Sequence, residues 1–230
     1  GGHGNYSNLV LAPASAQEMF DFTRKAFTLA DQYRLTVFIL SDAYIGQMME
    51  PVEISGPVLH GDRKDWAVYG DAESRPNLIS SIYMNPHLQR KHNELLQDVY
   101  QQLEREQVDY QDILTEDADL VFIAYGISAR ICLSTMHALR EKGVKVGLMR
   151  PKTLFPFPKE RIQTLAAQGK ILAVVELSSG MMADDVELQV RGRTTVLRYL
   201  TMGGETPTVK ELIANVERDL KTCSGGGSDA

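Results

Sequence analysis

Cysteine and long apolar runs are both scarce in this sequence of 230 residues, and each scarcity excludes a class of protein. The two cysteines, Cys132 and Cys223, are too few for a disulfide framework or for a cysteine-based metal site. No apolar run approaches the roughly 18 to 20 residues that cross a bilayer, and no secretory leader opens the chain. We therefore expect a cytoplasmic protein with no metal site of its own and no membrane partner.

Basic residues are also in the minority. The chain has 24 Lys and Arg against 30 Asp and Glu, a net charge of -6, and its basic residues form no clustered stripe. Nucleic-acid binding normally requires such a stripe, so we expect no nucleic-acid partner. The hydrophobic content of 43% is ordinary for a globular protein, and the length fits one large domain or two small ones.

The most regular pattern lies in residues 118–221. An unbroken apolar run at 120–125 predicts a strand covered on both faces, and Gly126 turns the chain into a helix that ends at Gly143. A second strand is expected at 144–149. It should stop there, because Pro151 and the prolines after it have no backbone N–H to donate to a neighbouring strand. Strands at 170–175 and 194–200 alternate with helices at 159–168 and 181–190, and Thr208 caps a final helix that reaches residue 220. This alternation predicts a doubly wound parallel sheet.

The opening residues 1–50 contain a single strand-helix-strand unit. Strands are expected at 8–12 and 36–41, the second of them buried, and Ser15 with Glu18 forms a capping box at the start of the helix between them. One such unit cannot bury both faces of its sheet, so we expect it to be the trailing part of a larger domain. Residues 51–117 read as an irregular linker, with a short candidate strand at 66–69, followed by a connecting helix at 86–107. Residues 222–230 are predicted to be a disordered tail.

Several segments together resemble one enzyme family. The segments at 41–51, 124–130, 148–158 and 202–204 closely resemble the α subunit of 2-oxoacid:ferredoxin oxidoreductases. The branched-chain (2-ketoisovalerate) type is the nearest match, and the 2-oxoglutarate type is next. The closing pattern is shared with transketolases and dehydrogenase E1 components, but the glycine-rich loop at 1–4 and the segment at 46–49 are more specific. The resemblance implies an α/β fold, in which part of a thiamine-enzyme pyrimidine domain precedes a transketolase C-terminal-like sheet domain.

The resemblance also implies a reaction. Such enzymes decarboxylate a 2-oxoacid oxidatively to an acyl-CoA and pass the electrons to ferredoxin, and thiamine diphosphate supplies the chemistry. The diphosphate and Mg²⁺ are held mainly by the β subunit, coenzyme A is a cosubstrate, and iron–sulfur clusters lie on other subunits, so none is expected to bind this chain alone. The implied partners are the β, γ and ferredoxin-like subunits and ferredoxin, with a homodimer as a further option. The family's activating Glu and substrate-binding Arg would precede Gly1, so no catalytic residue is assigned and the chain alone is expected to be inactive.

Five residues are candidates for contact with a ligand. His3 lies in a loop that, by the resemblance, faces the thiamine site, where it would donate to an oxygen atom or only shape the loop. Asp42 and Gln47 follow a strand at the end where open α/β sheets bind ligands, although residues there also cap the next turn. Gly126 and Ser128 begin a helix whose free N–H groups could hold an anion. The segment lacks both common phosphate-loop patterns, which favours a structural turn.

Two questions remain open at the level of sequence. Arg150 would either bridge to another subunit or pair with a nearby carboxylate. The chain as a whole would either be part of a thiamine-dependent oxidoreductase or a standalone binding and assembly module that kept the fold without the chemistry.

Overall fold

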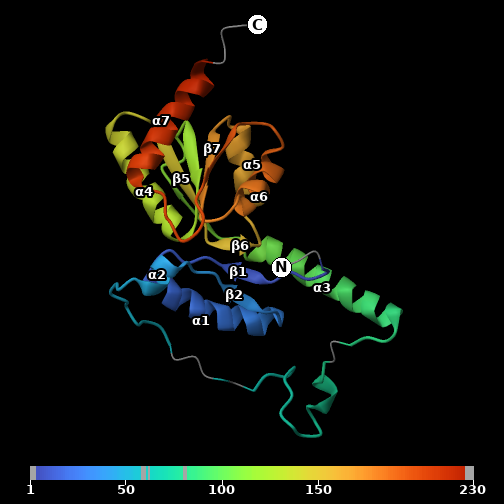
Figure 1. Ribbon diagram of the computed structural model, residues 1–230. Coiled ribbons are helices and arrows are strands. Elements are labelled where there is room, and N and C mark those ends of the chain that lie inside the picture. Colours follow the sequence, from blue (N-terminus) through green and yellow to red (C-terminus); the bar gives the residue numbers. More distant parts are fainter. Residues whose placement is uncertain (1–3, 58–60, 62, 80–81, 226–230) are drawn as a thin grey trace.

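The computed structural model describes residues 4–57, 61, 63–79 and 82–225, which form two packed α/β units and an extended arm (Figure 1). The opening unit is built on a three-stranded sheet with the order β2-β1-β6, and the closing unit on a five-stranded sheet with the order β3-β5-β4-β7-β8. His3 lies outside the described residues, as does the end of the predicted tail from residue 226 onward.

The opening unit follows the predicted strand-helix-strand order. Strand β1 (Leu9–Leu11) pairs in parallel with β2 (Val37–Ile39), and helix α1 (Ala16–Tyr33) connects them. Half of the predicted capping box at the start of α1 forms: the Ser15 side chain accepts a hydrogen bond from the Glu18 N–H at 3.1 Å, but the Glu18 carboxylate accepts from the Ala14 N–H at 2.8 Å. Residues Phe22, Leu29 and Tyr33 of α1 pack with β1 and with part of helix α3 (Pro86–Glu106). A short helix, α2 (Ala43–Gln47), follows β2.

Strand β2 is not buried, and the expectation that it would be is wrong. It lies at the edge of its sheet, and about half of Phe38 and of Leu40 is exposed. The apolar run at 36–41 predicted a covered strand, but among the described residues no strand pairs with its outer edge.

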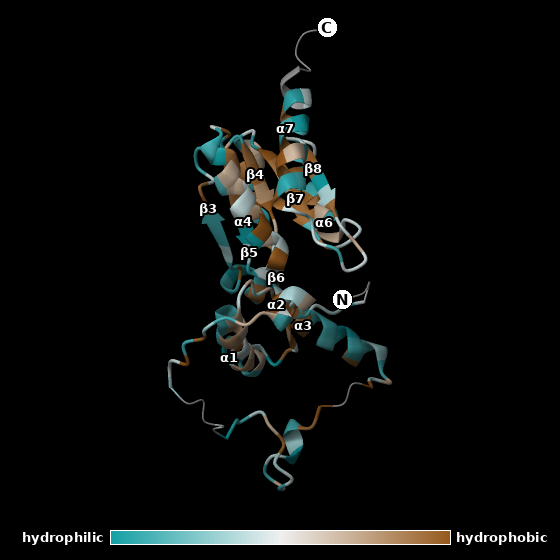
Figure 2. Ribbon diagram, turned by 60° about the vertical axis from the view of Figure 1, so that its left-hand side comes forward, coloured by the Kyte–Doolittle hydropathy of each residue, from teal (hydrophilic) through white to brown (hydrophobic). Residues whose placement is uncertain are grey.

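The closing unit confirms the predicted doubly wound sheet. Strands β4 (Leu120–Ile123), β5 (Val146–Pro151), β7 (Ile171–Glu176) and β8 (Val196–Leu200) are parallel. Helices α4 (Gly126–Glu141) and α7 (Val209–Gly225) cover one face, and α5 (Lys159–Ala167) and α6 (Met181–Val190) cover the other (Figure 1). The side chains of β4 alternate between the two apolar layers, with Phe122 facing α4 and Ile123 facing α5, so both faces are buried. Figure 2 shows the apolar residues concentrated in this unit.

The chain between β5 and α5 joins the two units, and the expectation that the strand would stop before Pro151 is wrong. Strand β5 includes Pro151, and β6 (Thr153–Phe155) then pairs antiparallel with β1 of the opening unit. Pro151 is tolerated because the pairing of β5 with β4 ends at Met149, so its only strand neighbour is β3. One continuous segment thus serves both sheets.

Three details of the less regular regions differ from the sequence prediction. Strand β3 (Tyr110–Ile113) pairs antiparallel with β5, although its residues were expected to be linker, because an exposed edge strand carries no apolar run. Residues 66–69 form no strand but a turn and a bend followed by irregular chain, and Trp66 lies against the Arg34 guanidinium. A 3-10 helix, η1 (Arg75–Asn77), follows them in the arm, and α7 continues to Gly225, past the expected end at residue 220.

No helix in the described part of the chain is long and apolar enough to span a membrane.

Candidate functional site

The carboxyl ends of the parallel strands in the closing unit meet at one edge of the sheet. Strand β4 has β5 on one side and β7 on the other, so the topological switch point lies between β4 and β7. Open α/β sheets place ligands in the crevice at this point. Tyr125 lies two residues after the end of β4 and Glu176 ends β7, and both line a cavity of about 340 Å³. We call this space the switch-point cavity and treat it as the candidate site.

Both units contribute walls to the switch-point cavity. Its opening-unit wall comes from β1, β6 and the residue that follows β2, and its closing-unit wall comes from α6 and from the residues at the ends of β4 and β7. Its volume falls in the range of small-molecule sites, and its lining combines aromatic and aliphatic side chains with a few polar groups. The lining residues are Ser7, Asn8, Val10, Leu40, Tyr125, Leu154, Phe155, Phe157, Glu176, Ser178, Met181, Met182 and Asp185.

Glu176 has a structural role at the floor of this cavity. Its buried carboxylate accepts hydrogen bonds from the N–H groups of Met182 at 3.0 Å and Ala183 at 2.9 Å, and from the Ser178 hydroxyl at 2.7 Å. The carboxylate thereby caps α6, whose first turn would otherwise leave these N–H groups without acceptors. Its charge also acts on the neighbouring groups of the cavity.

Two ionisable side chains of the cavity have raised pKa values. Burial, and then the negative charges of Glu176 and Asp42, raise the pKa of Tyr125, so its hydroxyl stays protonated as a hydrogen-bond donor. Burial, and then repulsion from Asp184 and Glu176, raise the pKa of Asp185. The cavity therefore offers a ligand the Tyr125 hydroxyl as a hydrogen-bond donor and the Asp185 carboxyl group, which takes up a proton more readily than an ordinary aspartate. Sequence reasoning missed both residues, because it placed Tyr125 only as the end of the apolar strand at 120–125 and Asp185 only within the helix at 181–190.

Asp42 and Gly126 meet, although they are 84 positions apart in the sequence. The Asp42 carboxylate accepts from the Ile45 N–H at 2.9 Å, which caps α2, and from the Ile127 N–H at 2.8 Å, at the start of α4. Gly126 has φ +58°, and a Cβ there would lie 2.4 Å from the Asp42 Oδ2. Ser128 is buried behind this contact. At this helix start, which could have held an anion although a structural turn was favoured, the acceptor is thus a carboxylate of the chain itself.

Gln47, the remaining described candidate, is exposed at the end of α2 and does not line the switch-point cavity. Asp42 does not line it either, but its charge reaches Tyr125. In the part of the chain that the structure covers, no three His, Cys, Asp or Glu side chains come together in a way that could hold a metal ion.

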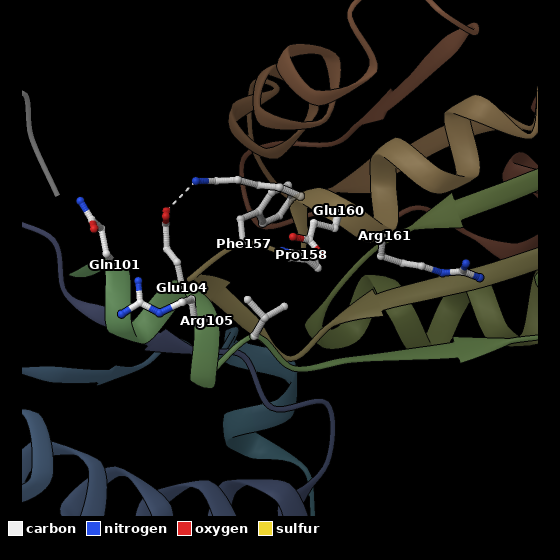
Figure 3. A pocket seen from close by; sticks show the side chains of 9 residues that line it. Gln101, Glu104, Arg105, Phe157, Pro158, Glu160 and Arg161 are labelled. Carbon is white, nitrogen blue, oxygen red and sulfur yellow. Dashed lines mark hydrogen bonds and ion pairs between the residues drawn. The ribbon is translucent and has the colours of Figure 1, made fainter. Parts of the chain in front are cut away.

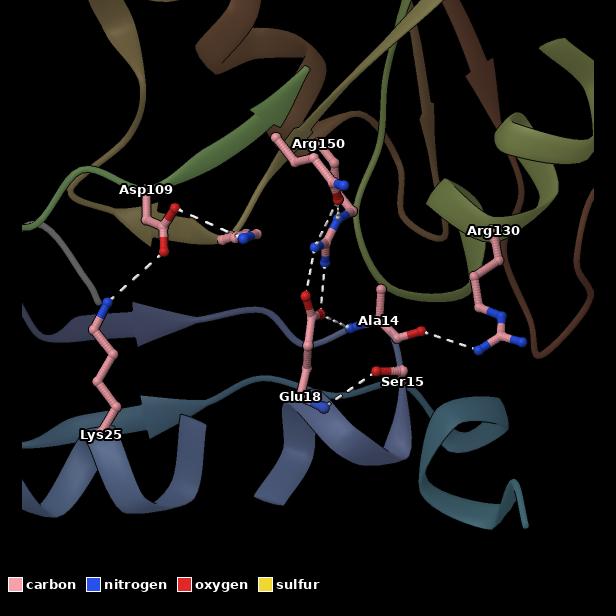
Figure 4. Close-up of polar contacts among 9 residues, drawn as sticks. Ala14, Ser15, Glu18, Lys25, Asp109, Arg130 and Arg150 are labelled. Atoms are coloured by element: carbon pink, nitrogen blue, oxygen red, sulfur yellow. Dashed lines mark hydrogen bonds and ion pairs between the residues drawn. The ribbon is translucent and has the colours of Figure 1, made fainter. Parts of the chain in front are cut away.

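Ion pairs fix the two units against each other beside the site (Figure 4). The Arg150 guanidinium donates to both carboxylate oxygens of Glu18, at 2.7 and 2.6 Å, so of its two predicted roles the pairing with a nearby carboxylate is the one observed. Arg130 pairs with Glu50 at 2.7 Å and also donates to the Ala14 carbonyl at 3.3 Å. These contacts hold the start of α1 against β5 and α4. They therefore help to fix the relative position of the two units that form the walls of the switch-point cavity.

A second cavity, of about 490 Å³, lies between the end of α3 and the start of α5 (Figure 3). Its walls carry several charges, including Glu104, Arg105 and Arg161. Lys159 spans it to pair with Glu104 at 2.6 Å, and Arg161 pairs with Asp112 at 2.7 Å. Because Lys159, Glu104 and Arg161 already have partners within the chain, the switch-point cavity is the better candidate.

Two family models match the chain. The first, described as pyruvate flavodoxin/ferredoxin oxidoreductase, thiamine diphosphate-binding, matches residues 4–112. The second, pyruvate:ferredoxin oxidoreductase core domain II, matches residues 118–212.

Curated relatives match along the whole chain. The ketoisovalerate oxidoreductase subunit VorB of Methanothermobacter marburgensis is 43% identical over 230 residues, which is 100% of this chain and 64% of that protein. The 2-oxoglutarate synthase subunit KorA of the same organism is 29% identical, over 94% of this chain and 65% of that protein. The chain thus spans a little under two thirds of the length of these relatives.

Solved structures share the fold. The 2-oxoglutarate:ferredoxin oxidoreductase of Magnetococcus marinus has a TM-score of 0.70 at 19% identity and covers 95% of this chain and 43% of that one. A split-gene transketolase, described as an inactive beta4 tetramer, has a TM-score of 0.50 at 14% identity and covers 93% of this chain and 57% of that one. With both α/β units matched by family models and relatives aligned from end to end, this chain belongs to the 2-oxoacid:ferredoxin oxidoreductase family.

Proposed function

We propose that this chain is part of the α subunit of a thiamine diphosphate-dependent 2-oxoacid:ferredoxin oxidoreductase. The whole enzyme would convert a 2-oxoacid to an acyl-CoA and carbon dioxide and pass two electrons to ferredoxin. The observation that carries this proposal is the 43% identity to a ketoisovalerate oxidoreductase subunit over the entire chain. The identity to the 2-oxoglutarate synthase subunits is lower, at 29%, so we propose a branched-chain 2-oxoacid such as 2-ketoisovalerate as the substrate.

Asp42 occupies the start of α4, so this candidate anion site offers no place for the diphosphate of thiamine diphosphate. From the family resemblance we propose that the diphosphate and Mg²⁺ are held mainly by a β subunit and that the iron–sulfur clusters lie on further subunits. Coenzyme A is the acyl acceptor in this proposal. No chemical step is assigned to a residue of this chain.

The role we propose for this chain is to cover the reaction site and to position neighbouring groups. The switch-point cavity would lie toward the β subunit, with the Tyr125 hydroxyl as a donor to a bound group. Asp42 would act as a positioning residue, because it fixes α4 and lies close enough to Tyr125 for its charge to raise the pKa of that hydroxyl. The open edge of β2 fits a protein that is completed by further chain or by other subunits. No relative supports the alternative of a standalone assembly module without catalysis.

The test uses the full-length α subunit co-expressed with its β, γ and ferredoxin-like subunits under anaerobic conditions. We expect the subunits to purify together and to reduce viologen dye with 2-ketoisovalerate, in a reaction that requires both coenzyme A and thiamine diphosphate. A higher kcat/KM for 2-oxoglutarate would overturn the substrate assignment. Failure to co-purify, together with no dye reduction by any 2-oxoacid, would overturn the enzyme class.

A matched pair of variants tests the role of the cavity. Tyr125→Phe removes the donor from the switch-point cavity, whereas Tyr110→Phe removes a hydroxyl from the partly exposed edge strand β3. We expect Tyr125→Phe alone to lower kcat/KM, by about tenfold if the hydroxyl donates one hydrogen bond in the transition state. Equal activity of the two variants would remove the cavity from the proposal and leave the enzyme class intact.

A further inference from the structure

The switch-point cavity has an acidic lining. Its described lining residues include two carboxylates, Glu176 and Asp185, and no Lys, Arg or His. Asp42 adds to this charge from outside the lining, since its carboxylate is near enough to raise the pKa of Tyr125. A cleft that is lined by charge of one sign and by low-dielectric walls concentrates ions of the opposite sign. The charge of the cavity therefore favours a cation and disfavours a carboxylate or a phosphate.

Asp185 is the carboxylate that remains available to a ligand. Glu176 is buried, and its oxygens already accept the three hydrogen bonds described above. Asp185 is exposed, and it forms no hydrogen bond or ion pair with any residue that the structure describes. Lys159, the cation whose charge acts on it, pairs instead with Glu104 at 2.6 Å. A cationic ligand would supply the counter-charge that the described part of the chain does not give Asp185.

Three aromatic side chains, Tyr125, Phe155 and Phe157, share the lining with this carboxylate. Phe155 is held in place by an edge-to-face contact with Tyr100, with the ring centroids 6.3 Å apart, and only 8% of Phe157 is exposed. Aromatic rings attract ammonium and guanidinium groups over their faces, and they also pack on the alkyl chain that carries such a group. Rings that share a cavity with a carboxylate therefore suit an organic cation better than a bare metal ion.

We propose that the switch-point cavity binds an alkylguanidinium or alkylammonium group, with the charge of the group on the Asp185 carboxylate and its apolar part against the aromatic rings. The cavity volume of about 340 Å³ has room for a group of this size. The group would belong either to a small free molecule or to an Arg or Lys side chain of another subunit, since the chemistry of recognition is the same. The proposal concerns the charge of the ligand and does not depend on the enzyme activity proposed above.

Calorimetric titration of the assembled complex tests the free cation. The probe is n-butylguanidinium, and n-pentanol and pentanoate serve as its neutral and anionic counterparts. The probe should bind more tightly than either, and Asp185→Asn should weaken its binding at least about tenfold, because a hydrogen-bonded charge is lost. Glu187→Gln is the matched control, since Glu187 lies on the same helix but pairs with Arg198 and does not line the cavity. Tighter binding of pentanoate than of the probe would overturn the proposal.

Subunit dissociation tests the other source of the cation. If an Arg or Lys of another subunit fills the cavity, the probe cannot enter the assembled complex. Asp185→Asn should then raise the dissociation constant of this subunit from the others at least about tenfold, and Glu187→Gln should leave it unchanged. The measurement is analytical ultracentrifugation over a concentration series, with circular dichroism to confirm that each variant is folded. A complex in which Asp185→Asn changes neither probe binding nor subunit dissociation would refute the site, and dye reduction would still report the enzyme class separately.

Discussion

Replacing Glu18 by Gln is expected to destabilise the protein by about 3 kcal/mol. The change leaves the Arg150 guanidinium, whose side chain is 7% exposed, without its counter-charge. Removing one partner of a buried ion pair costs about 3 to 5 kcal/mol. We expect the lower end, because the Glu18 side chain is 21% exposed and because the Gln111 Oε1 still accepts from Arg150 at 3.1 Å. Arg150→Met should cost less, since the freed carboxylate can be hydrated.

The double variant Glu18→Gln with Arg150→Met separates the ion pair from packing. Because it leaves no unpaired charge, it should be more stable than the sum of the two single changes predicts, by about 2 kcal/mol. The assay is urea unfolding followed by far-ultraviolet circular dichroism, with a check that the m-value stays constant. Additive costs, or a loss of less than about 1 kcal/mol in Glu18→Gln, would falsify the view that this pair locks the two units together.

The same ion pair predicts a dependence on pH. Burial opposes the ionisation of Glu18, but the hydrogen bonds from Arg150 and from the Ala14 N–H outweigh it and hold the pKa of Glu18 below its ordinary value. A carboxyl group with a lowered pKa in the folded state stabilises that state fully above its unfolded pKa of about 4.3, and this contribution is lost as the pH falls through the folded value. The stability difference between the native protein and Glu18→Gln should therefore be constant at neutral pH and shrink below about pH 4.3.

Three further substitutions test the local geometry by thermal or urea unfolding. Asp42→Ala removes the caps of two helices and should cost about 2 kcal/mol, near 1 for each cap; a loss below about 0.5 would contradict the double cap. Gly126→Ala should cost more than about 2 kcal/mol of stability, because the added Cβ would clash with the Asp42 Oδ2. The control is Gly143→Ala, which is also at positive φ but has open space around it and should cost about 1 kcal/mol. Equal losses in the two variants would refute the clash. Gly147→Ala should be strongly destabilising, since its Cβ would lie 2.7 Å from a backbone oxygen, and a folded variant of native stability would contradict that packing.

The sequence by itself determined the closing unit and the boundaries of most helices. Apolar runs such as residues 120–123 and the glycine turn at Gly126 are local signals, and the elements they predict are present within a few residues. The capping box at Thr208 also forms, because both of its hydrogen bonds lie within a single helical turn. At Ser15 the serine half forms, and the Glu18 carboxylate accepts from the Ala14 N–H. The motifs that carried the resemblance also led to the family that the comparisons support.

Only the tertiary structure decided how these elements combine into a site. Asp42 reaches the start of α4, 84 positions further along the sequence, and Arg150 finds Glu18 from the other unit. Strand β6 joins the opening sheet, β3 extends the closing sheet, and Tyr125 and Glu176 come together at the switch point, all through contacts between distant segments. The local pattern of apolar and polar residues indicates whether a side chain is buried, but it does not indicate which segment packs on it. Strand pairing and strand order depend on the packing of the whole chain. That is why the residues around the cavity could be recognised only once the two units were seen in place.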